Sequence, residues 1–177
     1  MKATGIVRRI DDLGRVVIPK EIRRTMRIRE GDPLEIFTDH DGEVIFKKYS
    51  PIGELFNFAA SYCETLHKSC GLTVLVCDRD SIIACAGLSK KEFVDHKLPQ
   101  EMERLIERRQ LFCHRKGEAL IDVGKAGVYI GALMPILLDG DIIGAVCSIT
   151  EDDSEPGDLE VKLVQTAAAF LAKQLES

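Results

Sequence analysis

The fold of the N-terminal region is decided by the stretch Gly14-Arg15-Val16-Val17-Ile18-Pro19-Lys20-Glu21-Ile22-Arg23-Arg24. The β-rich run Arg15–Ile18 predicts a short strand, and Pro19 fits the first position of a helix that runs to about Met26. Upstream, Gly5–Ile10 predicts another strand, and the Asp and Gly residues between the two strands predict a turn. The region therefore starts as a strand, a turn, a strand and a short helix.

The residues that follow this helix predict a hairpin. Strand patterns cover Pro33–Thr38 and Glu43–Lys48, and Asp41-Gly42 between them favours a tight turn. Four short strands and one short helix cannot bury much apolar area, and domains of about fifty residues commonly need a partner to be stable. We expect residues 1–50 to form an obligate homodimer, with Ser50-Pro51 marking the boundary of the domain.

Charge is unevenly distributed along the 177 residues, whose net charge is −5. That total argues against a nucleic-acid binder. Residues 1–29, however, contain nine basic and three acidic side chains, a net charge of +6, whereas residues 49–177 contain 13 basic and 20 acidic ones, a net charge of −7. Because nucleic-acid binding depends on local charge density, this division predicts a polyanionic partner for the first region and a different role for the second.

Most basic side chains of the N-terminal region are arginines. Guanidinium groups stay charged and bind phosphate or guanine edges bidentately, and they lose less rotamer freedom per hydrogen bond than lysine does. A solvated basic face is the alternative interpretation, but the density of these residues favours binding to double-stranded DNA. A helix-turn-helix reader needs two successive helices, so strands, loops and DNA shape are expected to carry recognition here.

The quoted stretch, with its surroundings from Met1 to Tyr49, resembles the AbrB-like family of bacterial transition-state regulators. The resemblance implies a swapped-hairpin dimer, in which strands of two chains interleave, and a DNA-contacting face built from arginines. The positions that match the family's DNA-binding arginines are Arg8, Arg15, Arg23 and Arg24. The full set of predicted DNA-binding residues is Arg8, Arg9, Arg15, Lys20, Arg23 and Arg24, with Arg27 and Arg29 as additional candidates.

Residues 51–177 have the apolar periodicity of a folded domain. The expected elements are a helix from Leu55 that ends at Gly71, strands Leu72–Cys77 and Ile82–Ala86, a helix Pro99–Arg109, strands Gly127–Leu138 and Asp141–Ile149, and a helix Leu159–Leu175. This order predicts an α+β domain with one central antiparallel sheet. One terminal helix is expected to cover the sheet and the other to meet a neighbouring chain, which would assemble a homotetramer through this domain.

The stretch Met134–Val146 resembles the returning hairpin of GAF domains, and the chain resembles those AbrB-like regulators of sporulation genes, activators or repressors, that carry a GAF-like domain. The resemblance implies a sheet against which an unknown small molecule could be held, and no specific cofactor is predicted. The same pattern also suits any tight hairpin in a buried sheet. Ligand sensing and oligomerisation therefore remain alternative roles for residues 51–177.

Catalytic and metal sites have little support in the sequence. Cys113-His114 is the best candidate for a catalytic pair, but neighbouring residues on a strand point to opposite faces. Cys63, His67 and Cys70 recur at helical spacing and could ligate zinc, yet no fourth ligand is evident. We expect no catalytic residue and no metal. The six cysteines, which form no CxxC pair, are expected to be reduced and packed as small hydrophobes.

A rival function comes from the MazE-like antitoxins, which share the fold that the N-terminal resemblance implies. Those proteins usually end in a short flexible tail that wraps a toxin, whereas residues 51–177 are expected to fold. A transcription regulator is therefore the favoured interpretation. No apolar run reaches the ~18–20 residues that span a bilayer, and the N-terminus lacks the apolar stretch of a secretory signal, so a cytoplasmic protein with no membrane partner is expected.

Overall fold

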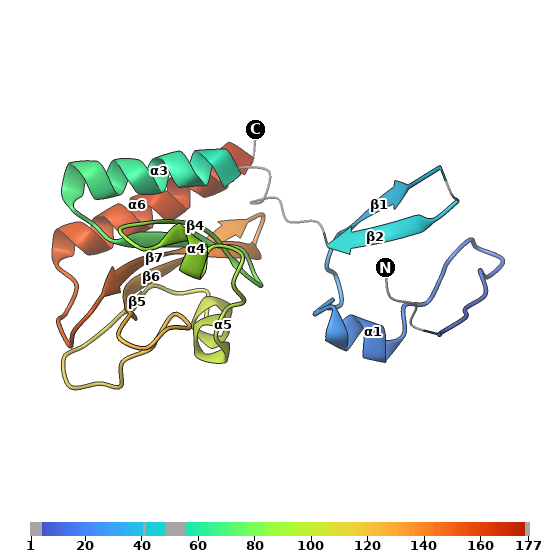
Figure 1. The fold of residues 1–177 in the computed structure, drawn as a ribbon, viewed down its shortest axis with the longest axis horizontal. Coiled ribbons are helices and arrows are strands. Elements are labelled where there is room, and N and C mark those ends of the chain that lie inside the picture. The colour runs from blue at the N-terminus through green and yellow to red at the C-terminus, as the bar shows by residue number, and fades with distance from the viewer. Residues whose placement is uncertain (1–4, 41, 49–55, 176–177) are drawn as a thin grey trace. The chain divides into compact units, whose positions relative to one another are not determined.

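A computed structural model describes residues 5–40, 42–48 and 56–175. The chain divides into two compact units, Met1–Tyr49 and Ser50–Ser177, and each is considered by itself (Figure 1). Within the described ranges, no helix is long and apolar enough to cross a membrane.

The N-terminal unit contains one short helix and one hairpin. Helix α1 spans Lys20–Thr25, and strand β1 (Leu34–Thr38) pairs antiparallel with β2 (Val44–Lys48). Pro19 is the buried N-cap of α1, a position where its missing N–H leaves no hydrogen bond unmade. The predicted helix and hairpin are therefore confirmed, although the predicted turn residue Asp41 lies outside the described residues.

The segment before α1 differs from the expectation. The sequence predicts strands over residues 5–10 and 15–18, but neither segment is a strand in this chain. The turn between them does form, because the Asp11 N–H donates to the Arg15 carbonyl and the Gly14 N–H donates to the Asp11 carbonyl, both at 3.0 Å. A strand requires backbone pairing to a neighbouring strand. The strand prediction is wrong for one chain by itself, since β1 and β2 pair with each other and not with these segments.

Many large apolar side chains of the N-terminal unit are exposed. Val7 is 90% exposed, Val17 is 69% and Ile36 is 62%, and Pro19 is the only residue among the described part of this unit that is classed as buried. The other exposed large hydrophobics of the unit are Ile6, Ile10, Leu13, Val16, Met26, Phe37, Val44 and Phe46. Single exposed apolar residues are ordinary on protein surfaces, but eleven in so small a unit leave it without a core of its own.

The C-terminal unit is built on a five-stranded sheet with the order β4-β3-β7-β6-β5. All neighbouring strands are antiparallel. The strands are β3 (Val74–Cys77), β4 (Ile82–Ala86), β5 (Phe112–Cys113), β6 (Tyr129–Leu138) and β7 (Asp141–Thr150). The long hairpin β6-β7 turns at Asp139-Gly140, and both residues have a positive φ, as a tight hairpin turn requires. The predicted central antiparallel sheet is confirmed.

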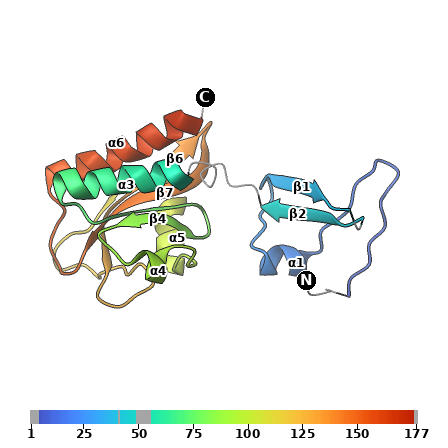
Figure 2. The same ribbon diagram turned by 45° about the horizontal axis from the view of Figure 1, so that its top comes forward.

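Two long helices cover one face of this sheet, α3 (Phe56–Cys70) and α6 (Asp158–Leu175), as Figures 1 and 2 show. Their small and aliphatic side chains share one core with the sheet, because Ala59 and Cys63 from α3 and Ala167 and Leu171 from α6 are all fully buried in the same cluster. The expectation that only one of these helices covers the sheet is therefore wrong, and a contact between either helix and a neighbouring chain stays a prediction. Both are needed to close the domain.

The opposite face carries a second core. It is covered by α4 (Lys90–Phe93), α5 (Gln100–Glu107) and the loops around them, which bring Phe93, Met102 and Leu105 against Leu133 and Cys147 of the sheet. Helix α5 lies inside the predicted Pro99–Arg109, with Pro99 as its N-cap. Both faces are thus filled from within one chain, and the unit is an α+β domain with a complete interior.

Candidate nucleic-acid interface

The turn that precedes α1 is organised by the carboxylate of Asp11. Its Oδ1 accepts hydrogen bonds from the backbone N–H groups of Leu13 (3.0 Å) and Arg15 (2.8 Å), and its Oδ2 accepts one from Arg15 Nε at 2.8 Å. This is an Asx-type turn, in which a short polar side chain replaces backbone partners. It fixes Arg15 beside an acidic group.

The Asp11–Arg15 ion pair is solvent-exposed. The Arg15 side chain is 68% exposed and that of Asp11 36%. The backbone and side-chain hydrogen bonds from Arg15 lower the pKa of Asp11 below its ordinary value of 3.8, so the carboxylate stays charged at neutral pH. Exposed pairs of this kind contribute little to stability, and the Arg15 guanidinium remains accessible to a further anion.

Helix α1 carries three of the predicted DNA-binding side chains, Lys20, Arg23 and Arg24. They are exposed, and their spacing of three and four residues places them on neighbouring positions of the helix surface. Arg23 and Arg24 lie in the last turn of the helix. Cations at that end interact favourably with the partial negative charge of the helix C-terminus.

The end of α1 is a left-handed cap. Arg27, the second residue after the helix, has φ +53°, its N–H donates to the Arg24 carbonyl at 3.3 Å, and the Ile28 N–H donates to the Arg23 carbonyl at 2.7 Å. These are the two hydrogen bonds of a Schellman motif, in which glycine is the usual residue at the left-handed position. The cap stops α1 after two turns and turns the chain toward β1.

All six predicted DNA-binding residues are exposed and lie in the same unit. Arg8 and Arg9 are on the limb before the Asp11 turn, Arg15 directly follows the turn, and the other three are on α1. The basic residues are thus distributed over three adjoining segments of the chain. Sequence reasoning missed the ion pair to Asp11, although an Asp at position i and an Arg at i+4 around a turn were visible in the sequence.

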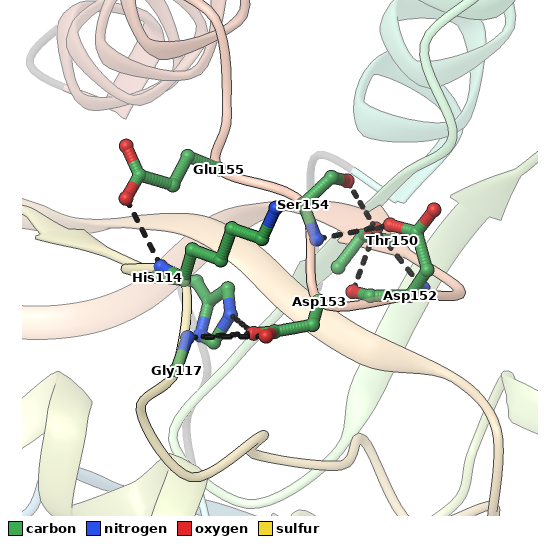
Figure 3. A network of polar contacts seen from close by, with 8 residues as sticks. His114, Gly117, Thr150, Asp152, Asp153, Ser154 and Glu155 are labelled. Carbon is green, nitrogen blue, oxygen red and sulfur yellow. Dashed lines mark hydrogen bonds and ion pairs between the residues drawn. The ribbon is translucent and has the colours of Figure 1, made fainter.

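A network of polar contacts in the C-terminal unit includes His114, the histidine of the Cys113-His114 pair that was considered as a catalytic candidate. His114 is 2% exposed, and its Nε2 lies 2.7 Å from Asp153 Oδ1, which also accepts from the Gly117 N–H at 3.2 Å (Figure 3). These contacts lower the pKa of Asp153, the hydrogen bond from His114 most of all. The Lys116 N–H donates to Glu155 Oε1 at 3.0 Å, so the network joins the loop after β5 to the loop before α6.

The predicted zinc candidates are spread between interior and surface. Cys63 is fully buried, Cys70 is exposed, and His67 Nδ1 lies 2.9 Å from the Leu72 carbonyl oxygen. In the part of the chain that the structure describes, no group of three His, Cys, Asp or Glu residues is placed to hold a metal ion. All six cysteines are free. Burial raises the pKa of the Cys63 thiol to about 12 and also raises the pKa of the Cys77 and Cys147 thiols well above its ordinary value, so these thiols stay protonated and unreactive in the folded domain.

Aromatic side chains line the outer surface of the α3 and α6 pair. A shallow groove of about 380 Å³ runs along α3 and is lined by Phe58, Ser61, Tyr62 and Thr65. Phe170 of α6 stacks on Phe58 and on Tyr62, with ring centroids 5.6 Å and 5.1 Å apart. Phe58 nevertheless remains 47% exposed. This surface faces away from the sheet, because the buried residues of both helices are on the sheet side.

Solved structures share the fold of the C-terminal unit. The GAF domain from a phosphoenolpyruvate-protein phosphotransferase of Coxiella burnetii matches with a TM-score of 0.54 at 15% identity, covering 69% of this chain and 82% of that one. Residues 122 to 287 of a methyl-accepting chemotaxis protein match with a TM-score of 0.55 at 15% identity, covering 70% and 90% of the two chains. Identities this low show the fold alone, and the predicted GAF-like fold is confirmed.

The N-terminal unit has relatives of its own. Residues 7–53 match the family described as "Antidote-toxin recognition MazE, bacterial antitoxin". The transition state regulatory protein AbrB of Bacillus subtilis (strain 168) is 63% identical over 51 residues, which cover 29% of this chain and 52% of that protein. The AbrB-like character of this unit is thereby confirmed.

The remaining comparisons span the larger unit and the whole chain. Residues 54–176 match the family described as "Stage V sporulation protein T C-terminal, transcription factor". Stage V sporulation protein T of Bacillus subtilis (strain 168) is 52% identical over 181 residues, which cover 99% of this chain and 99% of that protein. With an AbrB-like unit followed by a GAF-like domain, the chain belongs to the stage V sporulation protein T family.

Proposed function

We propose that this protein is a DNA-binding transcriptional regulator of sporulation genes that works in the cytoplasm. Its N-terminal unit binds double-stranded DNA as a homodimer, and its GAF-like domain joins dimers into a homotetramer. The observation that carries the proposal is the combination, in one AbrB-like unit, of exposed arginines with an apolar surface that a single chain leaves uncovered.

Dimerisation is supported by the exposed apolar residues of the N-terminal unit. Burying an apolar side chain of the size of valine or isoleucine contributes about 1.5–3 kcal/mol, and this unit has eleven large apolar side chains that remain exposed in one chain. Residues 5–10 and 15–18 have the composition of strands and lack a partner strand in one chain. A second copy supplies both the apolar contact and the strand partners.

DNA binding is supported by the charge and position of Arg8, Arg9, Arg15, Lys20, Arg23 and Arg24, which are all exposed. Helix α1 has only six residues, so it is too short to act as a major-groove recognition helix. The arginines are therefore expected to contact DNA from the segment before the Asp11 turn, from the turn itself and from the end of α1. Phosphate contacts set the register of the protein on DNA. Sequence preference then comes largely from DNA shape.

Tetramer formation is supported by the aromatic surface of α3 and α6. Phe58 is exposed and stacks on Phe170, which with Tyr62 is half-buried against the edge of the core, and aromatic side chains are enriched where proteins associate. No particular ligand is proposed for the GAF-like domain. A small molecule, if one binds, would act by changing how this domain associates.

The DNA-binding proposal is tested by sequencing DNA that co-immunoprecipitates with the native protein and measuring affinity for the recovered sites. Arg23→Ala with Arg24→Ala should weaken binding by about 1–3 kcal/mol for each lost contact. Arg104→Ala, an exposed arginine on α5, is the matched control and should leave affinity unchanged. If the double variant binds as tightly as the parent protein, the arginine surface is not the DNA interface.

Assembly is tested by light scattering. Full-length protein should be tetrameric, and a fragment of residues 1–50 should be a folded dimer that still binds DNA. A second linked dimer contributes about 10²–10⁴ in apparent affinity, so the fragment should bind a single site more weakly. A full-length protein that is only dimeric would remove the assembly role from the GAF-like domain.

An antitoxin is the competing function, because the N-terminal unit matches the MazE family. Residues 56–175 contain a closed α+β domain in the place where the flexible tail of such an antitoxin is expected. Co-purification of a stoichiometric small toxin from the source organism, with release of that toxin on proteolysis of this chain, would support the antitoxin function instead.

A further inference from the structure

One of the six predicted DNA-binding side chains is paired with an acidic residue. Arg15 Nε donates to Asp11 Oδ2 at 2.8 Å, and the backbone N–H of Arg15 donates to Asp11 Oδ1 at the same distance. Within the described ranges, no ion pair joins the other five predicted side chains to an acidic residue. Arg15 therefore differs from the rest of the arginine surface in its local charge.

The two carboxylate oxygens of Asp11 have separate roles. Oδ1 accepts from the backbone N–H groups of Leu13 and Arg15 and so forms the turn, whereas Oδ2 holds the Arg15 side chain. The amide oxygen of an asparagine can accept the same backbone hydrogen bonds, but an amide lacks the charge that attracts a guanidinium. The turn and the ion pair can therefore be separated by substitution.

The ion pair determines which atoms of Arg15 can meet a ligand. The bond to Asp11 uses Nε, so the two terminal nitrogens, Nη1 and Nη2, are not part of it. The Arg15 side chain is 68% exposed, which leaves it open to a ligand. Two N–H groups of a guanidinium match the O6 and N7 acceptors of a guanine in the major groove. A guanidinium held by Nε presents such a fork in a fixed orientation.

The charge of Asp11 acts differently on a phosphate and on a base edge. The hydrogen bonds from Arg15 lower the pKa of Asp11, so its carboxylate is ionised at neutral pH and the pair has no net charge. A phosphate brought to Arg15 is repelled by this carboxylate, and a neutral pair releases few of the counterions that drive non-specific binding. Guanine acceptors carry no net charge and meet much less repulsion. The pair therefore favours a base edge over a phosphate.

We propose that Asp11 determines the DNA specificity of the N-terminal unit: its carboxylate holds Arg15 by Nε and keeps the guanidinium from phosphates of arbitrary sequence. Asp11 is a positioning residue, because it acts through Arg15 and does not itself touch DNA. The proposal rests on the proposed function of this unit, and it adds a direct base contact to the preference that comes from DNA shape. Specific binding commonly uses such a repulsive group against the wrong partner.

Asp11→Asn in the full-length protein removes the charge and keeps the acceptor of the turn. Fluorescence anisotropy measures affinity for the DNA recovered with the native protein and for a scrambled duplex of the same length, over a series of salt concentrations. Binding to the scrambled duplex should tighten about tenfold, and its slope of log affinity against log salt should steepen by about two for a dimer, since each chain gains one phosphate contact. Binding to the recovered DNA should change little, so the ratio of the two affinities should fall several-fold.

Two further proteins complete the test. Asp12→Asn is the matched control, because it removes a neighbouring exposed carboxylate of the same turn, and it should leave the ratio unchanged. Asp11→Asn is also combined with Arg15→Ala. If Asp11 acts through Arg15, the added substitution should not alter the ratio that Arg15→Ala has by itself. Circular dichroism melting of each variant verifies that it is folded.

The inference is wrong if Asp11→Asn keeps the parent ratio while Arg23→Ala weakens binding to the recovered DNA. It is equally wrong if Asp12→Asn lowers the ratio as much, or if Asp11→Asn lowers it further in the Arg15→Ala protein, because Asp11 would then act through total charge or through the turn. If Arg15→Ala and Arg23→Ala are both without effect on binding, the proposed function of the unit fails and the inference fails with it.

Discussion

The two units of this chain reach a folded state by different means. In the C-terminal unit both faces of the sheet are covered from within the chain, and Leu133 and Leu171 are 0% exposed. In the N-terminal unit Val7 and Val17 remain largely exposed, and the segments around the Asp11 turn have no strand partner. The larger unit is complete as a single chain, whereas the smaller one has no core of its own in a single chain, which is the basis of the proposed dimer.

This difference suits their proposed roles. A DNA-binding unit that folds only as a dimer presents its arginines in symmetric pairs whenever it is folded at all, so a monomer cannot bind half of a site. A domain that folds by itself can instead change its contacts with neighbours without unfolding. The following substitutions test how far this contrast holds.

The largest effect is expected in the closed core. Leu171→Ala should destabilise the C-terminal unit by about 2–5 kcal/mol, because it removes a fully buried side chain from α6 and leaves a cavity. Leu159→Ala, on the same helix at a position that is 70% exposed, is the control and should change stability by less than about 0.5 kcal/mol. Urea unfolding of the fragment 51–177 measures both. Equal effects would mean that α6 does not close the core.

A smaller effect is expected at the DNA surface of the open unit. Arg15→Ala should weaken DNA binding by about 1–3 kcal/mol without affecting the stability of the fragment 51–177. Asp11→Asn provides the opposite test, because it removes the negative charge beside Arg15 and should preserve or increase affinity. Fluorescence anisotropy at one salt concentration compares the two. Weaker binding by the Asp11 variant would show that the turn, and not the arginine charge, is what DNA binding needs.

The two fragments should also respond differently to dilution. Unfolding of an obligate dimer depends on concentration, so the stability of fragment 1–50 should fall by about 1.4 kcal/mol for each tenfold dilution. The interior of fragment 51–177 is formed within one chain and should show a much weaker dependence. Urea midpoints measured over a series of protein concentrations provide the comparison. A fragment 1–50 whose midpoint is constant would contradict the dimer.

The smallest effects are expected on the stability of the two fragments at acid pH. The pKa of Asp153 is lowered by the hydrogen bond from His114, and that of Asp11 by hydrogen bonds from Arg15. A carboxyl group whose pKa is lower in the folded state stabilises that state above its unfolded pKa, and this contribution is lost as pH falls through the folded pKa. Asp153→Asn and Asp11→Asn should each flatten the acid side of the stability curve, Asp153 in fragment 51–177 and Asp11 in fragment 1–50. Melting temperatures between neutral pH and the acid limb measure it, and curves parallel to those of the parent would contradict the assigned hydrogen bonds.

Much of this fold could be predicted from local pattern. The hairpin of β1 and β2, the long hairpin of β6 and β7, and the end of α3 before Gly71 follow from turn residues and periodicity. The short elements α4 and β5 were missed, because four and two residues carry no detectable period. The strands expected over residues 5–10 and 15–18 are absent in one chain, because local composition does not supply the neighbouring strand that backbone pairing needs.

The site was predictable in composition but not in detail. The exposure of all six predicted DNA-binding residues agrees with their charge. The capping geometry at Arg27 could not be foreseen, because the usual mark of such a cap is a glycine and the position holds an arginine. The pairing of His114 with Asp153 depends on the sheet that brings residues 39 positions apart together.

The burial of the thiols makes their rate of alkylation a measure of how often the GAF-like domain opens. Cys77 and Cys147 are fully enclosed and protonated, whereas Cys70 lies on the surface. An alkylating reagent should therefore modify Cys70 at once, and the interior thiols only when the GAF-like domain opens. Mass spectrometry of one sample over time would follow these modifications, and the later ones would report how often the domain opens. An effector that stabilises the closed domain would slow modification of the interior thiols and leave that of Cys70 unaltered.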